Sequence, residues 1–308
     1  MSNLAVIDIG SNSLKVSVIA RSSGQEIARE HEFVRLFPAD GHEVVLAPAT
    51  MEAAIQAVAR LLLVAQSHQA APIILLGTSA LRECTNRSEF DAKLRQTTGH
   101  GLTLISGEVE ARLAADGIRS DPALASYQHL FAFDLGGGSL EVMEMRGQRC
   151  TLARSYPLGS VRLTHSLLAG AREPINEAAQ LAFRFELVKE LCNVIPSRIA
   201  EKALIVGVGG AFATIASYLE AIGEPPVAGA LPLLRIRELK DKICRLSANQ
   251  RVNLPGIPAN RLDIMPAALI TLCVLAELTG ASAFTLTHCG VRHGMVKLLM
   301  TENGGLIA

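Results

Sequence analysis

The 308-residue sequence has no tryptophan, and aromatic residues make up only 4% of it. Hydrophobic residues still make up 49%, so a sizeable core must be built mainly from Ala, Leu, Ile and Val. Cores of this kind are common in α/β proteins. The length favours two domains of ~150 residues each.

The sequence also lacks the signs of a membrane or secreted protein. No apolar stretch reaches the ~18 uncharged residues expected of a spanning helix, and the N-terminus shows no signal peptide. The six cysteines are scattered without a C-x-x-C pair, which favours reduced thiols over a disulfide or zinc framework. We therefore expect a cytoplasmic protein without a membrane partner.

Net charge is absent too, because 29 basic residues balance 29 acidic residues. A general nucleic-acid-binding protein usually has a basic excess, so no nucleic-acid partner is expected. Any polyanion site must be a local patch rather than a field of the whole protein. The sequence also contains no G-x-S-x-G and no H-E-x-x-H, which argues against a serine hydrolase and a zinc protease.

One short pattern is present twice: DIGSNS at 8–13 reappears as DLGGGS at 134–139. Each copy joins an apolar run to a second strand-like segment. The ordinary interpretation is a hairpin turn, but two copies favour a function, because small residues and free backbone N–H groups suit phosphate oxygens. Two such turns facing each other would hold one phosphate group from two sides. The candidate phosphate-binding residues of the turns are Asp8, Ser11, Asn12, Ser13, Gly136, Gly137, Gly138 and Ser139.

The order of predicted elements also begins twice, as β-β-β-α-β-α-β-α. This order indicates a duplicated α/β protein, with domains at 1–121 and 122–308 and a cleft between them. The best candidate linker is 120–128. Strands are predicted at 4–9, 14–20, 25–36, 73–76, 102–105, 129–134, 139–145, 149–156, 203–208 and 284–287. Helices are predicted at 51–66, 88–96, 158–168, 174–194, 235–246, 264–279 and 291–300, after Ser106 and from Ala211.

Several acidic residues are candidates for chemistry. The hairpin after Asp134 returns Glu141 across the turn, so both carboxylates can approach one divalent cation; the alternative for Glu141 is a solvated strand residue. Ser106 is predicted to cap a helix whose first turn contains Glu108 and Glu110. Helix-dipole stabilisation and a Glu108–Arg112 pair are ordinary roles. An ionised Glu at a helix start is nonetheless well suited to orient a water molecule.

Two further turns suit anions. Arg82 follows a predicted strand and small hydroxyl residues, where it would bind phosphate or simply lie on the surface. Gly209 and Gly210 lie in a strand-to-helix turn that presents a helix N-terminus to an anion. With Phe212 in place of a third glycine, this turn does not match a dinucleotide fingerprint.

Taken together, the motifs resemble the exopolyphosphatase/guanosine pentaphosphate phosphatase (Ppx/GppA) family in a short two-domain form. That resemblance implies a duplicated actin-like ATPase (ribonuclease H-like) α/β fold. The matching segments cover nearly the whole chain: AVIDIGSNSLKVSV (5–18), GTSALRECTN (77–86), ISGEVEARL (105–113), FAFDLGGGSLEV (131–142), YPLGSVRLT (156–164), GVGGAFATIA (207–216) and CGVRHGM (289–295).

The resemblance implies a role for individual residues. Glu110 matches the family's catalytic Glu, which orients or deprotonates the attacking water. Asp134 and Glu141 match its metal-linked carboxylates, which implies Mg²⁺ or another divalent cation. Asp8 matches the Asp of the first phosphate turn, and Arg82 matches a phosphate-contacting Arg. A homodimer is also a family-level expectation.

The sequence departs from the family pattern at two of these motifs. Val109 replaces an acidic residue often found beside the catalytic Glu, and Lys15 stands where His or another residue often follows the first turn. The expected activity is release of terminal phosphate from inorganic polyphosphate, with guanosine pentaphosphate as the alternative substrate. A small-molecule kinase of the same superfamily and a non-catalytic ligand-binding regulator remain alternatives of another class.

Overall fold

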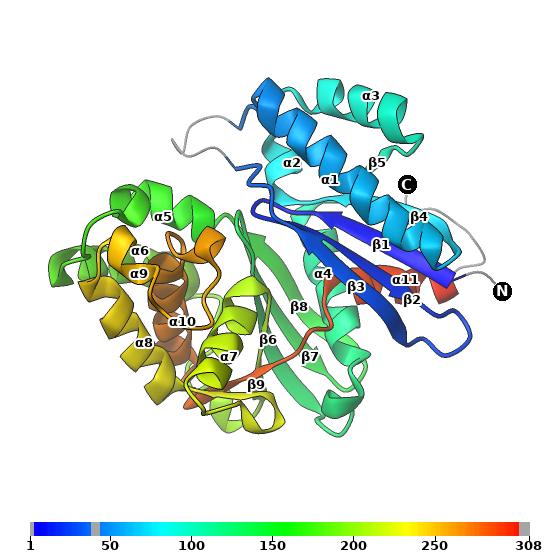
Figure 1. Ribbon diagram of the computed structural model, residues 1–308. Coiled ribbons are helices and arrows are strands. Elements are labelled where there is room, and N and C mark those ends of the chain that lie inside the picture. The colour runs from blue at the N-terminus through cyan, green and yellow to red at the C-terminus, as the bar shows by residue number, and fades with distance from the viewer. Residues whose placement is uncertain (1–2, 38–43, 302–308) are drawn as a thin grey trace. The chain divides into compact units, whose positions relative to one another are not determined.

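A computed structural model describes residues 3–37 and 44–301 of the chain (Figure 1). The chain forms two compact units. Among the described residues, unit 1 contains those up to Pro122 and those from Cys289, and unit 2 extends from Ala123 to His288. The division lies beside the predicted boundary at 121 and 122, within the predicted linker. The segment after Cys289, which the sequence placed in the second domain, belongs to unit 1.

Unit 1 is built on a mixed sheet of strand order β3-β2-β1-β4-β5. The first three strands are antiparallel, and β4 and β5 add parallel to β1. The strands are β1 Asn3–Ile9, β2 Leu14–Ile19, β3 Glu26–Glu32, β4 Ala70–Gly77 and β5 Leu102–Leu104. The helices are α1 Pro48–Ser67, α2 Ser79–Glu83, α3 Arg87–Thr98, α4 Gly107–Arg119 and α11 Val291–Thr301.

Helices cover both faces of the unit 1 sheet, so β1 is buried almost throughout. Leu4 and Val6 pack with residues of α4 and α11 in one apolar cluster. The two helices approach very closely at Gly294, which has no side chain. A Cβ at this position would lie only 1.8 Å from the Leu113 carbonyl oxygen of α4. This contact explains why the C-terminal helix returns to the first unit.

The opposite face of the sheet carries α1, which contacts β1 to β4. Among the described residues, α1 is the single helix whose length and apolar composition would allow it to cross a membrane. The sequence predicted no such helix because Glu52 and Arg60 interrupt the run. Leu63 of this helix is exposed, but one apolar face is buried in unit 1, as in the core helix of a globular domain. The buried residues are Met51, Ala54, Ile55, Ala57, Val58, Leu61, Leu62 and Ala65.

Unit 2 repeats the architecture, with strand order β10-β11-β9-β6-β7-β8. Its first three strands are antiparallel and β9 and β11 follow in parallel, as in unit 1, with β10 added at the edge. The strands are β6 His129–Leu135, β7 Leu140–Arg146, β8 Arg149–Tyr156, β9 Leu204–Val208, β10 Ala230–Pro232 and β11 Ala283–Leu286. The helices are α5 Ser160–Leu168, α6 Glu177–Leu191, α7 Gly210–Ala221, α8 Leu233–Arg245, α9 Ala248–Arg251 and α10 Met265–Thr279. The shared strand order confirms the predicted duplication.

Several of the chain's few aromatic residues lie in the core of unit 2. Phe133 and Phe212 each make an edge-to-face contact with Phe284, at centroid distances of 6.4 and 5.4 Å. Around these rings pack aliphatic residues of α5 to α8 and α10, as the composition predicted. This packing supports β6, the interior strand from which the β6–β7 turn begins.

Candidate functional site

In unit 1 the first predicted phosphate turn joins β1 to β2. The Gly10 N–H donates to the Ser13 carbonyl at 3.2 Å, which closes the turn tightly. The side chains of Ser11, Asn12 and Ser13 are all buried. The turn is therefore an ordered element of the sheet rather than an exposed loop.

Asp8 lies at the end of β1, directly opposite Lys15 in β2. Thr78 donates its hydroxyl to Asp8 Oδ1 at 3.4 Å, and Arg292 Nη1 lies 4.0 Å from Oδ2. Burial raises the pKa of the Asp8 carboxyl above its ordinary value, while Arg292, Lys15, Thr78 and Arg82 act in the opposite direction. Asp8 is thus enclosed by donors and cations of its own unit.

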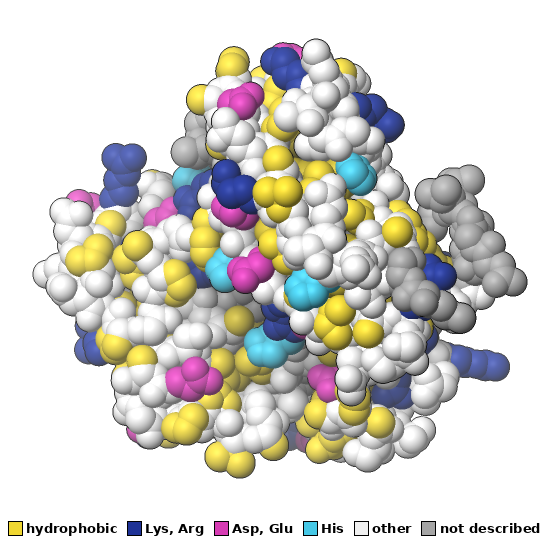
Figure 2. All heavy atoms as spheres, turned by 45° about the vertical axis from the view of Figure 1, so that its right-hand side comes forward, with side chains coloured by type: hydrophobic (Ala, Val, Ile, Leu, Met, Phe, Trp, Pro, Cys, Tyr) yellow, Lys and Arg dark blue, Asp and Glu magenta, His cyan; other side chains and the backbone are white. Residues whose placement is uncertain are grey.

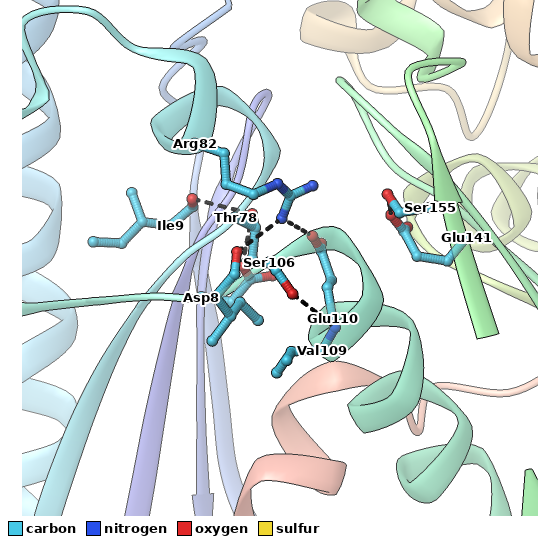
Figure 3. A network of polar contacts seen from close by, with 10 residues as sticks. Asp8, Ile9, Thr78, Arg82, Ser106, Val109, Glu110, Glu141 and Ser155 are labelled. Carbon is cyan, nitrogen blue, oxygen red and sulfur yellow. Dashed lines mark hydrogen bonds and ion pairs between the residues drawn. The ribbon is translucent and has the colours of Figure 1, made fainter. Parts of the chain in front are cut away.

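The predicted catalytic carboxylate, Glu110, lies in the first turn of α4 (Figure 3). Arg82 donates to this carboxylate and, at 3.3 Å, to the Ile105 carbonyl. The predicted cap is confirmed, because Ser106 accepts from the Val109 N–H at 3.2 Å. Both members of the Arg82–Glu110 pair are largely buried, so the carboxylate has a fixed orientation.

Two neighbours of Glu110 have ordinary roles. Glu108 is exposed and pairs with Arg112 at 2.8 Å, as the sequence allowed. Val109, which departs from the family pattern, packs against the apolar cluster of β1, α4 and α11. An acidic side chain there would face apolar neighbours, which gives a physical reason for the valine.

In unit 2, Asp134 lies directly opposite Glu141 across β6 and β7. Residues opposite each other in an antiparallel pair project from the same face of the sheet. Glu141 is only 2% exposed and accepts a 2.7 Å hydrogen bond from Ser155, which lies opposite it in β8 (Figure 3). The alternative of a solvated Glu141 is therefore wrong.

The second phosphate turn closes like the first, with the Gly136 N–H donating to the Ser139 carbonyl at 3.0 Å. The start of α5 packs behind it, where Ser160 donates its backbone N–H to the Gly136 carbonyl at 2.9 Å. Only glycine fits at position 159, because a Cβ there would lie 2.3 Å from the Gly137 carbonyl oxygen.

The Gly209–Gly210 turn lies beside Asp134 in the same unit. A Cβ on Gly209 would lie 2.7 Å from Asp134 Oδ1, and one on Gly210 would lie 2.2 Å from the guanidinium of Arg261. The N-terminus of α7 therefore has both a carboxylate and a guanidinium against it. The prediction that this turn presents a helix N-terminus to an anion stays a prediction.

The structure brings the predicted residues together in two groups, one in each unit. Sequence reasoning missed several residues that contact them. Some of these residues lie in segments that match the family, but only the folded chain shows which residues they contact. The missed residues are Arg292 at Asp8, Ser155 at Glu141, Arg162 at the second turn and Arg261 at Gly210.

A family model described as the Ppx/GppA phosphatase family matches residues 6–302. The chain belongs to the Ppx/GppA phosphatase family. The sequence resemblance is thereby confirmed over both units. The two sheets of matching strand order confirm the predicted duplicated α/β fold class.

Members of the Ppx/GppA family and related chains resemble this one at modest identity. An uncharacterized protein of Streptomyces coelicolor is 31% identical over 95% of this chain and 88% of its own length. A guanosine-5'-triphosphate,3'-diphosphate pyrophosphatase of Aeromonas salmonicida is 25% identical over 97% of this chain, which spans 60% of that relative. The crystal structure of an exopolyphosphatase from Cytophaga hutchinsonii has a TM-score of 0.84, with 19% identity and 97% of each chain covered.

Proposed function

We propose that this protein hydrolyses phosphoanhydride bonds and releases the terminal phosphate of inorganic polyphosphate. The observation that carries the proposal is the Glu110 carboxylate at the start of α4, which Arg82 holds in one orientation. Phosphoryl transfer needs positioning and charge stabilisation more than covalent chemistry. A fixed carboxylate is suited to align a water molecule and accept its proton.

The phosphate-binding groups are the backbone N–H groups of the two turns. In unit 2 the carbonyls of Gly136 and Gly137 accept from the start of α5. Because a trans peptide places C=O and N–H on opposite sides, the N–H groups of Gly137 and Gly138 point away from α5. Such outward-pointing backbone donors form an anion-binding concavity.

Mg²⁺ or another divalent cation fits the carboxylates of unit 2. Within residues 3–37 and 44–301, no three His, Cys, Asp or Glu side chains are grouped to hold a metal alone. Mg²⁺ often uses only one or two carboxylates together with substrate phosphates and water. Asp134 and Glu141 would supply those carboxylates. A bound cation would neutralise negative charge on the phosphate oxygens.

A local basic group suits a polyanionic substrate despite the neutral total charge. Arg82, Lys15 and Arg292 all act on Asp8 in unit 1. On the face shown in Figure 2, by contrast, Lys and Arg side chains are interspersed with Asp and Glu. Attraction of phosphate would therefore come from the turn region rather than from a broad field.

Guanosine pentaphosphate is the second candidate substrate, favoured by the similarity to the Aeromonas salmonicida pyrophosphatase. The deciding experiment measures phosphate release from polyphosphate and from guanosine pentaphosphate in parallel, with and without Mg²⁺. We expect Mg²⁺-dependent release that is faster from polyphosphate. Faster release from the nucleotide would assign the second activity. Release from neither, with transfer from ATP to a small acceptor, would indicate a kinase instead.

A further inference from the structure

The segment after β3 holds the first phosphate turn. The backbone N–H groups of Leu36 and Phe37 both donate to the Ser11 carbonyl, at 2.9 and 3.2 Å. Next to them, Arg35 donates its Nε–H to the side-chain oxygen of Asn12 at 3.0 Å. Two successive residues of the turn are thus bound by three successive residues of one segment.

The segment after β8 holds the second turn in the same way. The backbone N–H groups of Val161 and Arg162 both donate to the Gly137 carbonyl, at 2.8 and 3.2 Å. Arg162 also donates its Nε–H to the Gly138 carbonyl at 3.1 Å. Ser11 and Gly137 occupy the same position in the repeated pattern, and each accepts from two backbone N–H groups. The residue after each of them, Asn12 or Gly138, accepts from an arginine Nε.

In unit 2 the arginine contact sets the direction of a peptide group. The bond from Arg162 fixes the Gly138 carbonyl, and the trans geometry then points the Ser139 N–H to the opposite side. That N–H belongs to the predicted phosphate loop. The contact with Arg162 therefore sets the direction of this backbone donor.

In unit 1 the arginine binds a side-chain amide instead. A guanidinium only donates hydrogen bonds, so the oxygen of the Asn12 amide must face Arg35 and Nδ2 must point away. Asn12 is only 8% exposed. Its buried Nδ2 has no hydrogen-bond partner within the described part of the chain. A buried donor without an acceptor is costly, which indicates that a ligand oxygen completes it.

We propose that Arg35 and Arg162 are positioning residues, each of which binds one amide oxygen so that the amide N–H points at a phosphate oxygen of the substrate. The side-chain amide of Asn12 is the counterpart of the Gly138–Ser139 peptide. The inference rests on the proposed function for the identity of the substrate. In the first turn, Arg35 orients the Asn12 amide so that Nδ2 becomes the donor to phosphate.

The first test is Asn12→Asp. This change keeps an oxygen for Arg35, and its negative charge strengthens that contact, but it replaces the N–H donor with an acceptor. The probe is tripolyphosphate with Mg²⁺, titrated calorimetrically into a Glu110→Gln chain so that the ligand is preserved. We expect about 10- to 100-fold weaker binding. Binding within about 3-fold of the parent would overturn the proposal, because a purely structural pair tolerates Asp.

The second test asks whether Arg35 acts through Asn12. In the Glu110→Gln chain, Arg35→Leu and Asn12→Ala should each weaken tripolyphosphate binding about 10-fold. The double variant should be no weaker than the worse single variant, because two groups that form one unit are not additive. Multiplied losses would overturn the positioning role, since Arg35 would then contact the ligand directly.

Two further variants separate this role from general stability. Arg35→Lys keeps a donor for the Asn12 oxygen, so it should restore part of the binding lost in Arg35→Leu. Arg60 also donates through Nε in unit 1, to Glu32 at 2.8 Å, on an exposed surface. Arg60→Leu should therefore bind tripolyphosphate like the parent. Equal loss in Arg60→Leu and Arg35→Leu would overturn the proposal.

Turnover of the same variants with Glu110 intact separates this inference from the proposed function. A chain that binds tripolyphosphate through Asn12 but releases no phosphate contradicts the hydrolase function and supports the inference. A chain that turns over normally with Asn12→Asp supports the function and overturns the inference. If the Glu110→Gln chain binds no phosphate compound, the inference is overturned.

Discussion

Asp134 lies directly opposite Glu141 across β6 and β7, with both side chains on one face of the sheet. At the matching position of unit 1, Asp8 lies directly opposite Lys15. The repeated turn therefore carries two carboxylates in one copy and a carboxylate with an ammonium group in the other. This difference favours a cation in unit 2 and a directly bound phosphate oxygen in unit 1.

A cation in unit 2 predicts a specific effect of Glu141→Gln. The Mg²⁺ concentration that gives half the maximal rate of phosphate release should rise about 10- to 100-fold, because one of two carboxylates is lost. Glu144→Gln, on the same strand, is the matched control; it weakens contacts with Arg146 and Thr151, because one acceptor oxygen becomes an amide nitrogen. Equal Mg²⁺ dependence in the two variants would count against Glu141 as a ligand.

The assignment of Glu110 predicts a loss of turnover without a loss of binding. Glu110→Gln should lower kcat roughly 100- to 10,000-fold, because the amide no longer accepts a proton from water. The neighbouring Glu108 is exposed and pairs only on the helix surface with Arg112, so Glu108→Gln should leave kcat unchanged. Steady-state phosphate release measures both, and a near-normal Glu110→Gln chain would refute the role.

The close approach of α5 to the second turn predicts that Gly159→Ala is harmful. The added methyl group meets backbone at Gly137, which cannot rotate away as a side chain does. We expect a loss of about 1–3 kcal/mol in the free energy of unfolding and a higher KM. Denaturant unfolding and phosphate-release kinetics test this, and a variant as stable and as active as the parent would contradict the packing argument.

The largely buried His293 of α11 predicts loss of stability in acid. Burial lowers the pKa of His293 to about 4, and the nearby Arg292 and Arg29 add to this shift. The carboxylates of Glu26 and Asp121 oppose it. Since the unfolded histidine binds a proton near pH ~6.5, unfolding takes up a proton between these values. The stability present above pH ~6.5 therefore falls as the pH decreases toward 4, by roughly 2 kcal/mol.

His293→Gln stays neutral throughout that range, so it should lose about 2 kcal/mol less than the parent between pH 7 and pH 4.5. Denaturant unfolding at the two pH values measures the difference. The same loss in both chains would show that other groups, among them Glu26 with its lowered pKa, account for the acid sensitivity.

The parts of the fold that depend on local sequence were predictable. The two turns, the flanking strands and the Ser106 cap follow from residue type and spacing, and each lies where it was predicted. Short elements were missed, because α2, α9 and β10 are too short for a hydrophobic period to be read. Proline in β10 also argues against a strand.

Contacts between distant segments were not predictable. Arg292 reaches Asp8 only because α11 returns to unit 1 through its close packing on α4. Likewise, Arg35 and Arg162 bind their turns from segments that follow the third strand of each sheet. A single sequence holds no signal for such pairs, since the residues that meet are far apart along the chain.

The most direct measurement of the proposed activity is hydrolysis of polyphosphate in water enriched in oxygen-18. If Glu110 aligns water on the terminal phosphorus, each released orthophosphate should carry one heavy oxygen, and the remaining chain should carry none at its new end. Heavy oxygen found in the shortened chain would place the attack on the wrong phosphorus. No release of orthophosphate, with the phosphoryl group transferred to another acceptor, would contradict the hydrolase assignment.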